Sequence, residues 1–247
     1  MKPTVTIARS TAWSALALWL VAANVTAGSF QVNPIRIELA KGATTAAMTV
    51  HNDGDDAVVI QASVLSWSQD ESGQDVYAPT NEALVTPPIM TILPGGEQIV
   101  RIGMRRPPDP QRELTYRLYL AEVPPPPKPG FTGLQVALRV GVPVFVLPPV
   151  PAIRRLEWSA QIAADGAIRL GAQNTGNAHV QVTDFELGAP GSAEPFAQQT
   201  ALSYVLAGQH HVWTLPVPAD RVKAVSTFRL KAFTDAGEID TPVNVER

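Results

Sequence analysis

The stretch Leu134-Gln135-Val136-Ala137-Leu138-Arg139-Val140-Gly141-Val142-Pro143-Val144-Phe145-Val146 decides how this sequence is interpreted. Every even-numbered position in it holds leucine or valine, and the odd-numbered positions hold a mixture of residue types. A β-strand places alternate side chains on opposite faces. The pattern therefore predicts a strand with an unbroken row of branched aliphatic side chains along one face, which we call the aliphatic ridge: Leu134, Val136, Leu138, Val140, Val142, Val144 and Val146.

The length of this ridge is unusual. At about 3.3 Å per residue the stretch would extend for roughly 43 Å, whereas ordinary strands contain about 3–10 residues. Only part of the ridge is needed to close a small sandwich, and an exposed apolar edge invites pairing with another chain. Pro143 cannot donate a ladder hydrogen bond, which favours an edge position. The alternative is a long bent strand that lies wholly inside the protein's own core.

A proline-rich segment, Pro124–Gly130, precedes the ridge. Such a run is stiff and extended and cannot join a sheet. It could present the start of the ridge to a partner, or it could be a long hairpin connection without any contact role.

The first 27 residues have the pattern of a secretory signal peptide. Lys2 and Arg9 give a positive start, an apolar run of about a dozen residues follows, and Val25-Thr26-Ala27 supplies small residues before a cut after Ala27. A membrane anchor would need about 20 apolar residues. We therefore expect export with cleavage, and the formal net charge then changes from −3 to −5, because residues 1–27 contain no acidic residue.

The composition predicts an all-β protein without disulfide bonds. The chain has no cysteine, so disulfides, thiol catalysis and cysteine-based metal sites are excluded, and its acidic balance does not favour nucleic acids. Its 23 prolines and 17 glycines separate short alternating runs, which indicates β-sandwiches. We predict two immunoglobulin-like domains around a cleft, at residues 28–147 and 152–247, with a proline-rich linker at 148–151. The expected strands are Ile35–Leu39, Ala46–Val50, Val58–Trp67, Ile99–Met104, Thr115–Leu120, Ala167–Leu170, His179–Phe185, Ser203–Leu206, His211–Leu215, Thr227–Phe233 and Thr241–Val245.

No pattern of catalytic or metal-binding residues is present. The four histidines have no spacing typical of a zinc or copper site, and His210 and His211 should point to opposite faces of a strand. Nucleophile elbows, phosphate loops and dinucleotide fingerprints are missing. The acidic group around Gly54 lacks the bidentate glutamate of a calcium loop and is interpreted as a turn. We expect neither a cofactor, nor a metal, nor an enzymatic activity.

Four segments, taken in order, resemble the PapD-like periplasmic pilus chaperones. Val32–Ile37 resembles the family's first strand with its cleft arginine. Leu93-Pro94-Gly95 followed by Ile99–Ile102 resembles the signature before its sixth strand. Tyr116–Pro124 resembles the stretch that leads into the donor strand, and Leu134–Leu138 resembles the donor strand itself. The resemblance spans the chain after residue 27 and is clearer in its first half.

The resemblance implies a chaperone in the periplasm that completes pilus or fimbrial subunits lacking their last strand. It adds its own strand to the subunit's open sheet edge, which is donor-strand complementation. Leu134, Val136, Leu138, Val140 and Val142 would be the inserting residues. The implied partners are the subunits and an outer-membrane usher. The exposed aliphatic residues also suggest self-association of the client-free protein.

Arg36 matches the family arginine that binds the subunit's C-terminal carboxylate. Better-known members pair this arginine with a lysine late in the donor strand, where this sequence has Pro143. Either one arginine suffices or another residue compensates, with Arg101 as the first candidate and Arg139 as the second. This departure resembles the divergent branch that serves spore-coat-protein-U-like subunits. The alternative function is a secreted β-sandwich adhesion or fimbrial structural module, but a subunit would usually be a single sandwich with an N-terminal donor segment.

Overall fold

The computed structural model describes residues 30–40, 42–126, 136–164, 166–192, 194–216 and 225–246. Within these ranges every regular element is a strand, and no helix could cross a membrane. The predicted signal peptide, residues 127–130 of the proline-rich segment and Leu134 of the ridge lie outside the described residues. The all-β prediction is confirmed.

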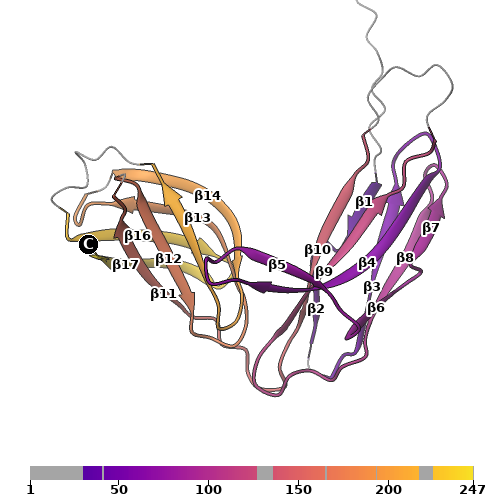
Figure 1. Cartoon of the computed structure of the whole chain (residues 1–247), viewed down its shortest axis with the longest axis horizontal. Helices are drawn as coiled ribbons and strands as arrows, with labels where there is room; N and C mark the ends of the chain where they lie inside the picture. Colours follow the sequence, from indigo (N-terminus) through magenta and orange to yellow (C-terminus); the bar gives the residue numbers. More distant parts are fainter. Residues whose placement is uncertain are drawn as a thin grey trace, which may run out of the picture.

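The first ten strands form a sandwich of two sheets (Figure 1). One sheet has four strands in the order β1-β3-β8-β6. The other has six, in the order β2-β10-β9-β4-β5, with β7 also paired to β4. The bounds are β1 (Phe30–Asn33), β2 (Ile37–Leu39), β3 (Thr45–Asn52), β4 (Val58–Gln69), β5 (Asp75–Pro79), β6 (Ala83–Thr86), β7 (Ile89–Ile92), β8 (Glu97–Met104), β9 (Leu114–Glu122) and β10 (Arg139–Val146).

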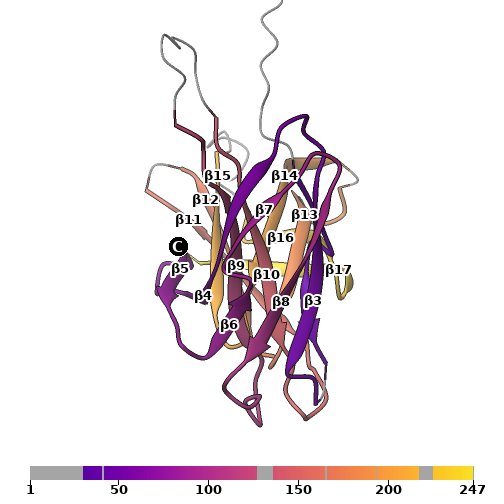
Figure 2. The ribbon, with the colours of Figure 1, turned by 90° about the vertical axis from the view of Figure 1, so that its right-hand side faces the viewer.

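The remaining strands form a second sandwich, in which seven strands follow one path in the order β14-β13-β16-β17-β11-β12-β15 (Figures 1 and 2). Their bounds are β11 (Leu156–Ile162), β12 (Ile168–Asn174), β13 (Val180–Gly188), β14 (Pro195–Val205), β15 (His210–Leu215), β16 (Thr227–Thr234) and β17 (Gly237–Glu246).

Period-two alternation explains both cores. In β9 the buried Tyr116, Leu118 and Leu120 alternate with half-buried residues, and in β10 Val142, Val144 and Val146 are buried in the same core. A strand with one apolar face must bury that face against a second layer, which here is the four-stranded sheet. The second core is built in the same way around Phe185, Phe228 and Leu230.

Several strand predictions need correction at their ends. In the second domain the strands expected at Ser203–Leu206 and Thr241–Val245 begin at Pro195 and Gly237, and two differences in the first domain bear on the site. The strand expected at Ile35–Leu39 begins only at Ile37, because residues 34–36 form a bend that carries the chain from one sheet to the other, and Ile35 is 77% exposed there. The strand expected over 134–146 begins at Arg139 among the described residues. Its partner β9 ends at Glu122, whose amide donates to the Leu138 carbonyl at 2.9 Å, so the described residues Val136 and Ala137 lie beyond the end of that ladder.

Five described strands were not among those expected from the alternation: β1, β5, β6, β7 and β11. Three of them lie between residues 75 and 92, where Pro79, Pro87 and Pro88 interrupt the alternation. These three strands are short, and they are held by hydrogen bonds to β4 or β8, which the local sequence pattern does not predict. Tertiary context outweighs weak local signals of this kind.

The two sandwiches meet through the β4–β5 hairpin, which reaches across to the second domain (Figure 1). His210 Nε2 lies 2.8 Å from the Glu71 carbonyl oxygen, and His211 Nδ1 lies 2.8 Å from that of Gly73. Gly73 has a φ of 78°, and a Cβ there would lie 2.9 Å from the Cα of His211. The close approach therefore requires glycine.

Candidate functional site

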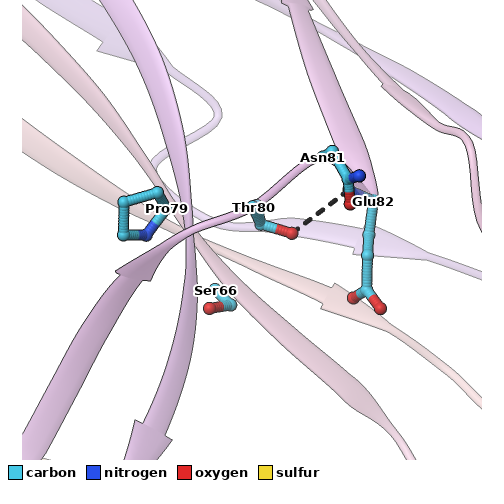
Figure 3. Close-up of a pocket in the computed structure, with 5 residues that line it drawn as sticks. All are labelled: Ser66, Pro79, Thr80, Asn81 and Glu82. Carbon is cyan, nitrogen blue, oxygen red and sulfur yellow. Dashed lines mark hydrogen bonds between the residues drawn. The ribbon is translucent and has the colours of Figure 1, made fainter.

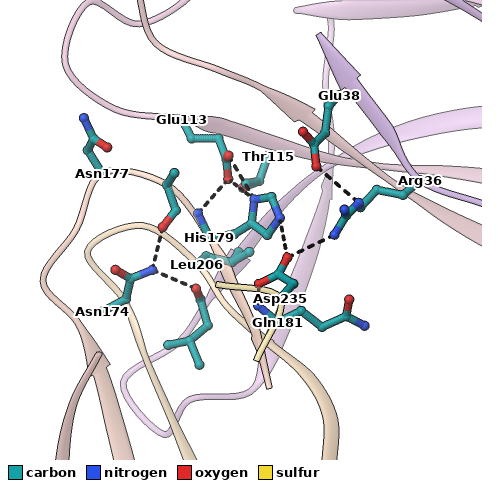
Figure 4. A network of polar contacts seen from close by, with 12 residues as sticks. Arg36, Glu38, Glu113, Thr115, Asn174, Asn177, His179, Gln181, Leu206 and Asp235 are labelled. Atoms are coloured by element: carbon teal, nitrogen blue, oxygen red, sulfur yellow. Dashed lines mark hydrogen bonds and ion pairs between the residues drawn. The ribbon is translucent and has the colours of Figure 1, made fainter. Parts of the chain in front are cut away.

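Arg36 lies in the bend before β2 and connects the two domains. Its Nη1 donates to Asp235 Oδ2 at 3.1 Å, and its Nε lies 3.2 Å from Glu38 Oε1 (Figure 4). Burial alone would lower the pKa of Arg36, but Glu38, Tyr204 and Asp235 together raise it. The guanidinium is therefore held as a cation between two carboxylates and is about one-third exposed.

A buried pair lies next to this arginine. His179, immediately before β13, has Nδ1 2.9 Å from both carboxylate oxygens of Glu113, and its amide donates to Glu113 Oε1 at 3.1 Å. Both side chains are fully buried, and Nε2 of His179 is 3.7 Å from Asp235 (Figure 4). Glu113 and Arg36 belong to the first domain, and His179 and Asp235 to the second, so polar side chains of both domains meet at this contact.

Aromatic rings line the same face. Phe145 of β10 stacks on His179 with ring centroids 3.5 Å apart and planes 12° apart. Trp67 and Phe145 form a cluster with Leu206, and Tyr77 and Tyr204 pack against it. Trp67 is thus buried between the domains. We call the whole arrangement the interdomain site: Arg36, Trp67, Glu113, Phe145, His179, Tyr204 and Asp235.

The upstream half of β10 has an unpaired edge. β9 pairs with all eight residues from Arg139 to Val146, whereas β2 pairs only with Val144, Phe145 and Val146. Among the described residues, Arg139 to Pro143 therefore have no ladder partner on the β2 side. This is the edge that a further strand could join.

The ridge residues differ in burial along the strand. Val136 is 50% exposed, Leu138 and Val140 pack only partly against the first core, and Val142 is 1% exposed in that core. In this conformation Val142 is therefore not available to a partner. Val144 and Val146 are likewise fully buried. One end of the ridge therefore closes the sandwich, and Val136, at the other end of its described part, is exposed.

The three predicted anchors lie in different places. Arg36 is in the interdomain site. Arg101 lies on β8 between Ala47 and Thr86, in the opposite sheet of the sandwich. Arg139 lies at the start of β10, with its guanidinium carbon 3.9 Å from the centre of the Tyr119 ring.

Sequence reasoning missed Arg117, which lies on β9 directly across from Pro143. It also missed the buried pair of Glu113 and His179. Arg117 could have been found by pairing β9 with the ridge residue by residue. It alternates with the core residues Tyr116 and Leu118, so its side chain lies on the face of the sheet that points away from the first core. No local signal marks Glu113 or His179, because the two residues contact each other but are 66 residues apart in the chain.

Cavities add little to this site. A surface hollow of about 620 Å³ is lined by Ser66, Pro79, Thr80, Asn81 and Glu82, at the start of β6 (Figure 3). A smaller cavity of about 170 Å³ lies at the domain contact beside Trp67, Glu113 and Leu206. Among the described residues no three histidine or acidic side chains gather closely enough to hold a metal ion.

Comparison with known proteins gives one family whose model matches this chain. Residues 29–151 match the family described as pili and flagellar-assembly chaperone, PapD N-terminal domain. No curated protein sequence is similar enough to count as a match.

Solved structures with the same fold are numerous. A chain of the CsuC–CsuE chaperone–tip adhesion subunit pre-assembly complex, from archaic chaperone-usher Csu pili of Acinetobacter baumannii, is 18% identical with a TM-score of 0.68, covering 89% of this chain and 100% of that one. The E. coli chaperone DraB is 21% identical with a TM-score of 0.58, and the coverage is 87% and 98%. A chain of the Salmonella enterica complex of SafA pilin with the SafB chaperone is 20% identical with a TM-score of 0.57, covering 87% and 95%. With this two-domain fold and the match over its first half, the chain belongs to the PapD-like family of pilus-assembly chaperones.

Proposed function

We propose that this protein is a periplasmic chaperone of the chaperone-usher type, which binds, folds and caps pilus subunits by donor-strand complementation. The observation that carries the proposal is the unpaired edge of β10, which starts beside exposed ridge residues and ends beside Arg36. An incomplete sheet that pairs with this edge gains backbone hydrogen bonds, and its groove receives alternate side chains.

The energy of such a complex would come mainly from the ridge. Burying one large aliphatic side chain contributes about 1.5–3 kcal/mol. Val136, Leu138 and Val140, together with Leu134, which we predict to insert as well, would give about 6–12 kcal/mol before ordering costs on this scale. Val142 already contributes to the chaperone's own core, so its insertion would require rearrangement of β10.

The two domains divide this work in our proposal. Residues 28–147 provide the donor strand, residues 148–151 the linker, and residues 152–247 the second wall of the interdomain site. An outer-membrane usher would receive the loaded complex. We also propose that the client-free protein self-associates through the exposed ridge, and a sedimentation experiment that finds only monomer at high concentration would exclude this.

Arg36→Ala is expected to reduce the recovery of a co-expressed subunit from the periplasm by about tenfold or more. A charge-assisted contact with a terminal carboxylate is worth about 1.5–3 kcal/mol and fixes the register of the added strand. Co-purification with quantitative mass spectrometry measures the effect. Arg101→Ala is the matched control, because it removes the same charge from the opposite sheet. Equal recovery with Arg36→Ala and the wild type would contradict the anchor.

A further inference from the structure

Gln69, the last residue of β4, is a buried polar residue whose side chain binds the second domain. It is 8% exposed. Its Nε2 donates to the Tyr204 carbonyl oxygen at 2.7 Å, and its Oε1 accepts from the Leu206 amide at 3.0 Å. Nε2 also donates to Asp75 Oδ1 at 3.2 Å. Because the carboxamide oxygen meets a donor and the nitrogen meets two acceptors, only one orientation of the group fits all three partners.

These bonds complete an edge of the second domain. Among the described residues β14 pairs only with β13, so the other side of its last residues has no strand partner. Leu206, directly after β14, is 2% exposed, and its amide would be buried without an acceptor if Gln69 were absent. The carboxamide takes the place of a peptide group of a neighbouring strand, since it binds one carbonyl and one amide. A side chain of the first domain thus belongs to the sheet edge of the second.

The hairpin that follows Gln69 contacts the same domain at further points (Figure 1). The backbone amide of Gln69 donates to Gln209 Oε1, and the carbonyl oxygens of Glu71 and Gly73 each lie 2.8 Å from a histidine ring nitrogen. We call this set of contacts the hairpin clasp. Its members are Gln69, Glu71 and Gly73 in the first domain, and Tyr204, Leu206, Gln209, His210 and His211 in the second.

The hairpin clasp is an attachment separate from the buried pair of Glu113 and His179. The two attachments share no residue, and members of both line the cavity of about 170 Å³ at the domain contact. Motion between domains is the default where their contact is small. A single attachment lets two domains swivel about it, whereas two separate attachments fix their angle.

The clasp also fixes the position of the Tyr204 side chain. The Tyr204 ring lies edge-on to Trp67 and tilted against Phe145, with both centroid distances at 5.4 Å. Its phenol group is hydrogen bonded to Arg36, the residue proposed to anchor the subunit. Gln69 holds the backbone of Tyr204, so the effect of Gln69 reaches the subunit site through this tyrosine.

We propose that Gln69 is a positioning residue for subunit capture. By closing the hairpin clasp it fixes the domain angle at which the free edge of β10 and Arg36 meet the same subunit. The inference rests on the proposed function and adds to it a residue that is itself buried, and therefore acts without touching the subunit.

Gln69→Glu, which conserves the shape of the side chain, provides a test with a pH profile. An ionised glutamate has no hydrogen for the Tyr204 carbonyl, whereas a protonated one has. Burial and the charge of Asp75 both raise the pKa of a carboxyl group at this position. We therefore expect the clasp of this variant to be open at about pH 9 and closed at about pH 5. Gln69→Leu, of similar size, makes neither bond at either pH.

The wild type at each pH corrects for the titration of the surrounding groups. The titratable and charged groups around position 69 are Asp75 of β5, Tyr204 of β14, His210 and His211 of β15, and Glu113 and Arg117 from the β9 side.

Two measurements separate the domain angle from capture. The chain has no cysteine, so nitroxide labels on Ala47→Cys and Glu238→Cys, both exposed positions, report the interdomain distance by pulsed electron paramagnetic resonance. Capture is measured with the pilus subunit that co-purifies with the wild type. This subunit is denatured and refolded with each unlabelled chaperone, and the soluble complex is quantified.

We expect one narrow distance distribution for the wild type at both pH values. The distribution should be broad for Gln69→Leu at both, and for Gln69→Glu only at about pH 9. Wherever it is broad, the yield of complex should fall about tenfold below that of the wild type at the same pH, as expected for two lost hydrogen bonds. Gln198→Glu is the matched control, because it makes the same change at an exposed position of β14 and should behave as the wild type.

The outcomes separate this inference from the function on which it rests. A narrow distribution in Gln69→Leu would show that the clasp does not fix the angle, and a broad one with undiminished capture would show that the angle does not govern capture. Either result overturns the role of Gln69 and leaves the chaperone proposal standing. If no subunit co-purifies with the wild type, the proposed function itself fails. Recovery of Gln69→Glu at about pH 5 shows that its loss of capture is not misfolding.

Discussion

Val136→Glu is expected to abolish the capture of a pilus subunit while leaving the chaperone folded. Val136 is 50% exposed and lies upstream of β10, so a carboxylate there disturbs no contact of the first core. In the proposed complex the same side chain enters an apolar groove, where an unpaired carboxylate costs several kcal/mol. Together with the lost apolar burial, this predicts a fall in affinity of at least about a hundredfold. Co-purification of a subunit from the periplasm measures the loss of capture, and circular dichroism of the free variant checks that the chaperone is still folded.

Ala137→Glu is the matched control. Ala137 is also exposed, carries the opposite parity and would point away from the groove. Capture that survives Ala137→Glu but not Val136→Glu would assign the effect to one face of the segment. Equal loss with both would indicate a general effect of negative charge and would contradict the donor-strand account.

The structure also changes which ridge residue is the best target. From sequence, Leu138→Glu is the natural choice, because Leu138 lies in the middle of the predicted inserting residues. Leu138 packs partly against the first core, and its backbone amide and carbonyl both contact Glu122. A glutamate there would face core atoms and a like charge, so loss of capture could follow from misfolding. Val136 has neither contact.

The fold was predictable where the pattern itself determines pairing. The alternation in β4, β8 and β9 and the ridge of β10 set which faces are buried, and β4, β8 and β9 lie within two residues of their expected bounds. The limits of β10 were not predictable, because they depend on where its neighbours end. The sequence shows thirteen alternating residues, and among the described ones β9 pairs with the last eight.

The interdomain site was predictable only in part. Arg36 was identified through a family resemblance, since a single arginine in a short segment carries no functional signal of its own. Its companions were not identified, because Asp235 lies 199 residues away and His179 contacts Glu113 across 66 residues. Side-chain pairs between domains depend on the angle at which the sandwiches dock, and no periodicity within either domain encodes that angle.

Glu113→Ala is expected to destabilise the protein by about 3–5 kcal/mol and to uncouple the two domains. The carboxylate of Glu113 accepts from the amide and Nδ1 of His179, and both side chains have no exposed surface. Its removal leaves these two donors buried without an acceptor, at a contact that holds the second domain against the first. Urea unfolding measures the loss of stability, and calorimetry should resolve two transitions where the wild type shows one.

Asp240→Ala is the control that separates burial from contact distance. Asp240 and Arg229 are only 2.6 Å apart, closer than Glu113 and His179, but both are more than one-third exposed. Solvent screens an exposed pair, so this substitution should leave the unfolding midpoint nearly unchanged. If the two variants were equally stable, the buried pair would not be what holds the domains together.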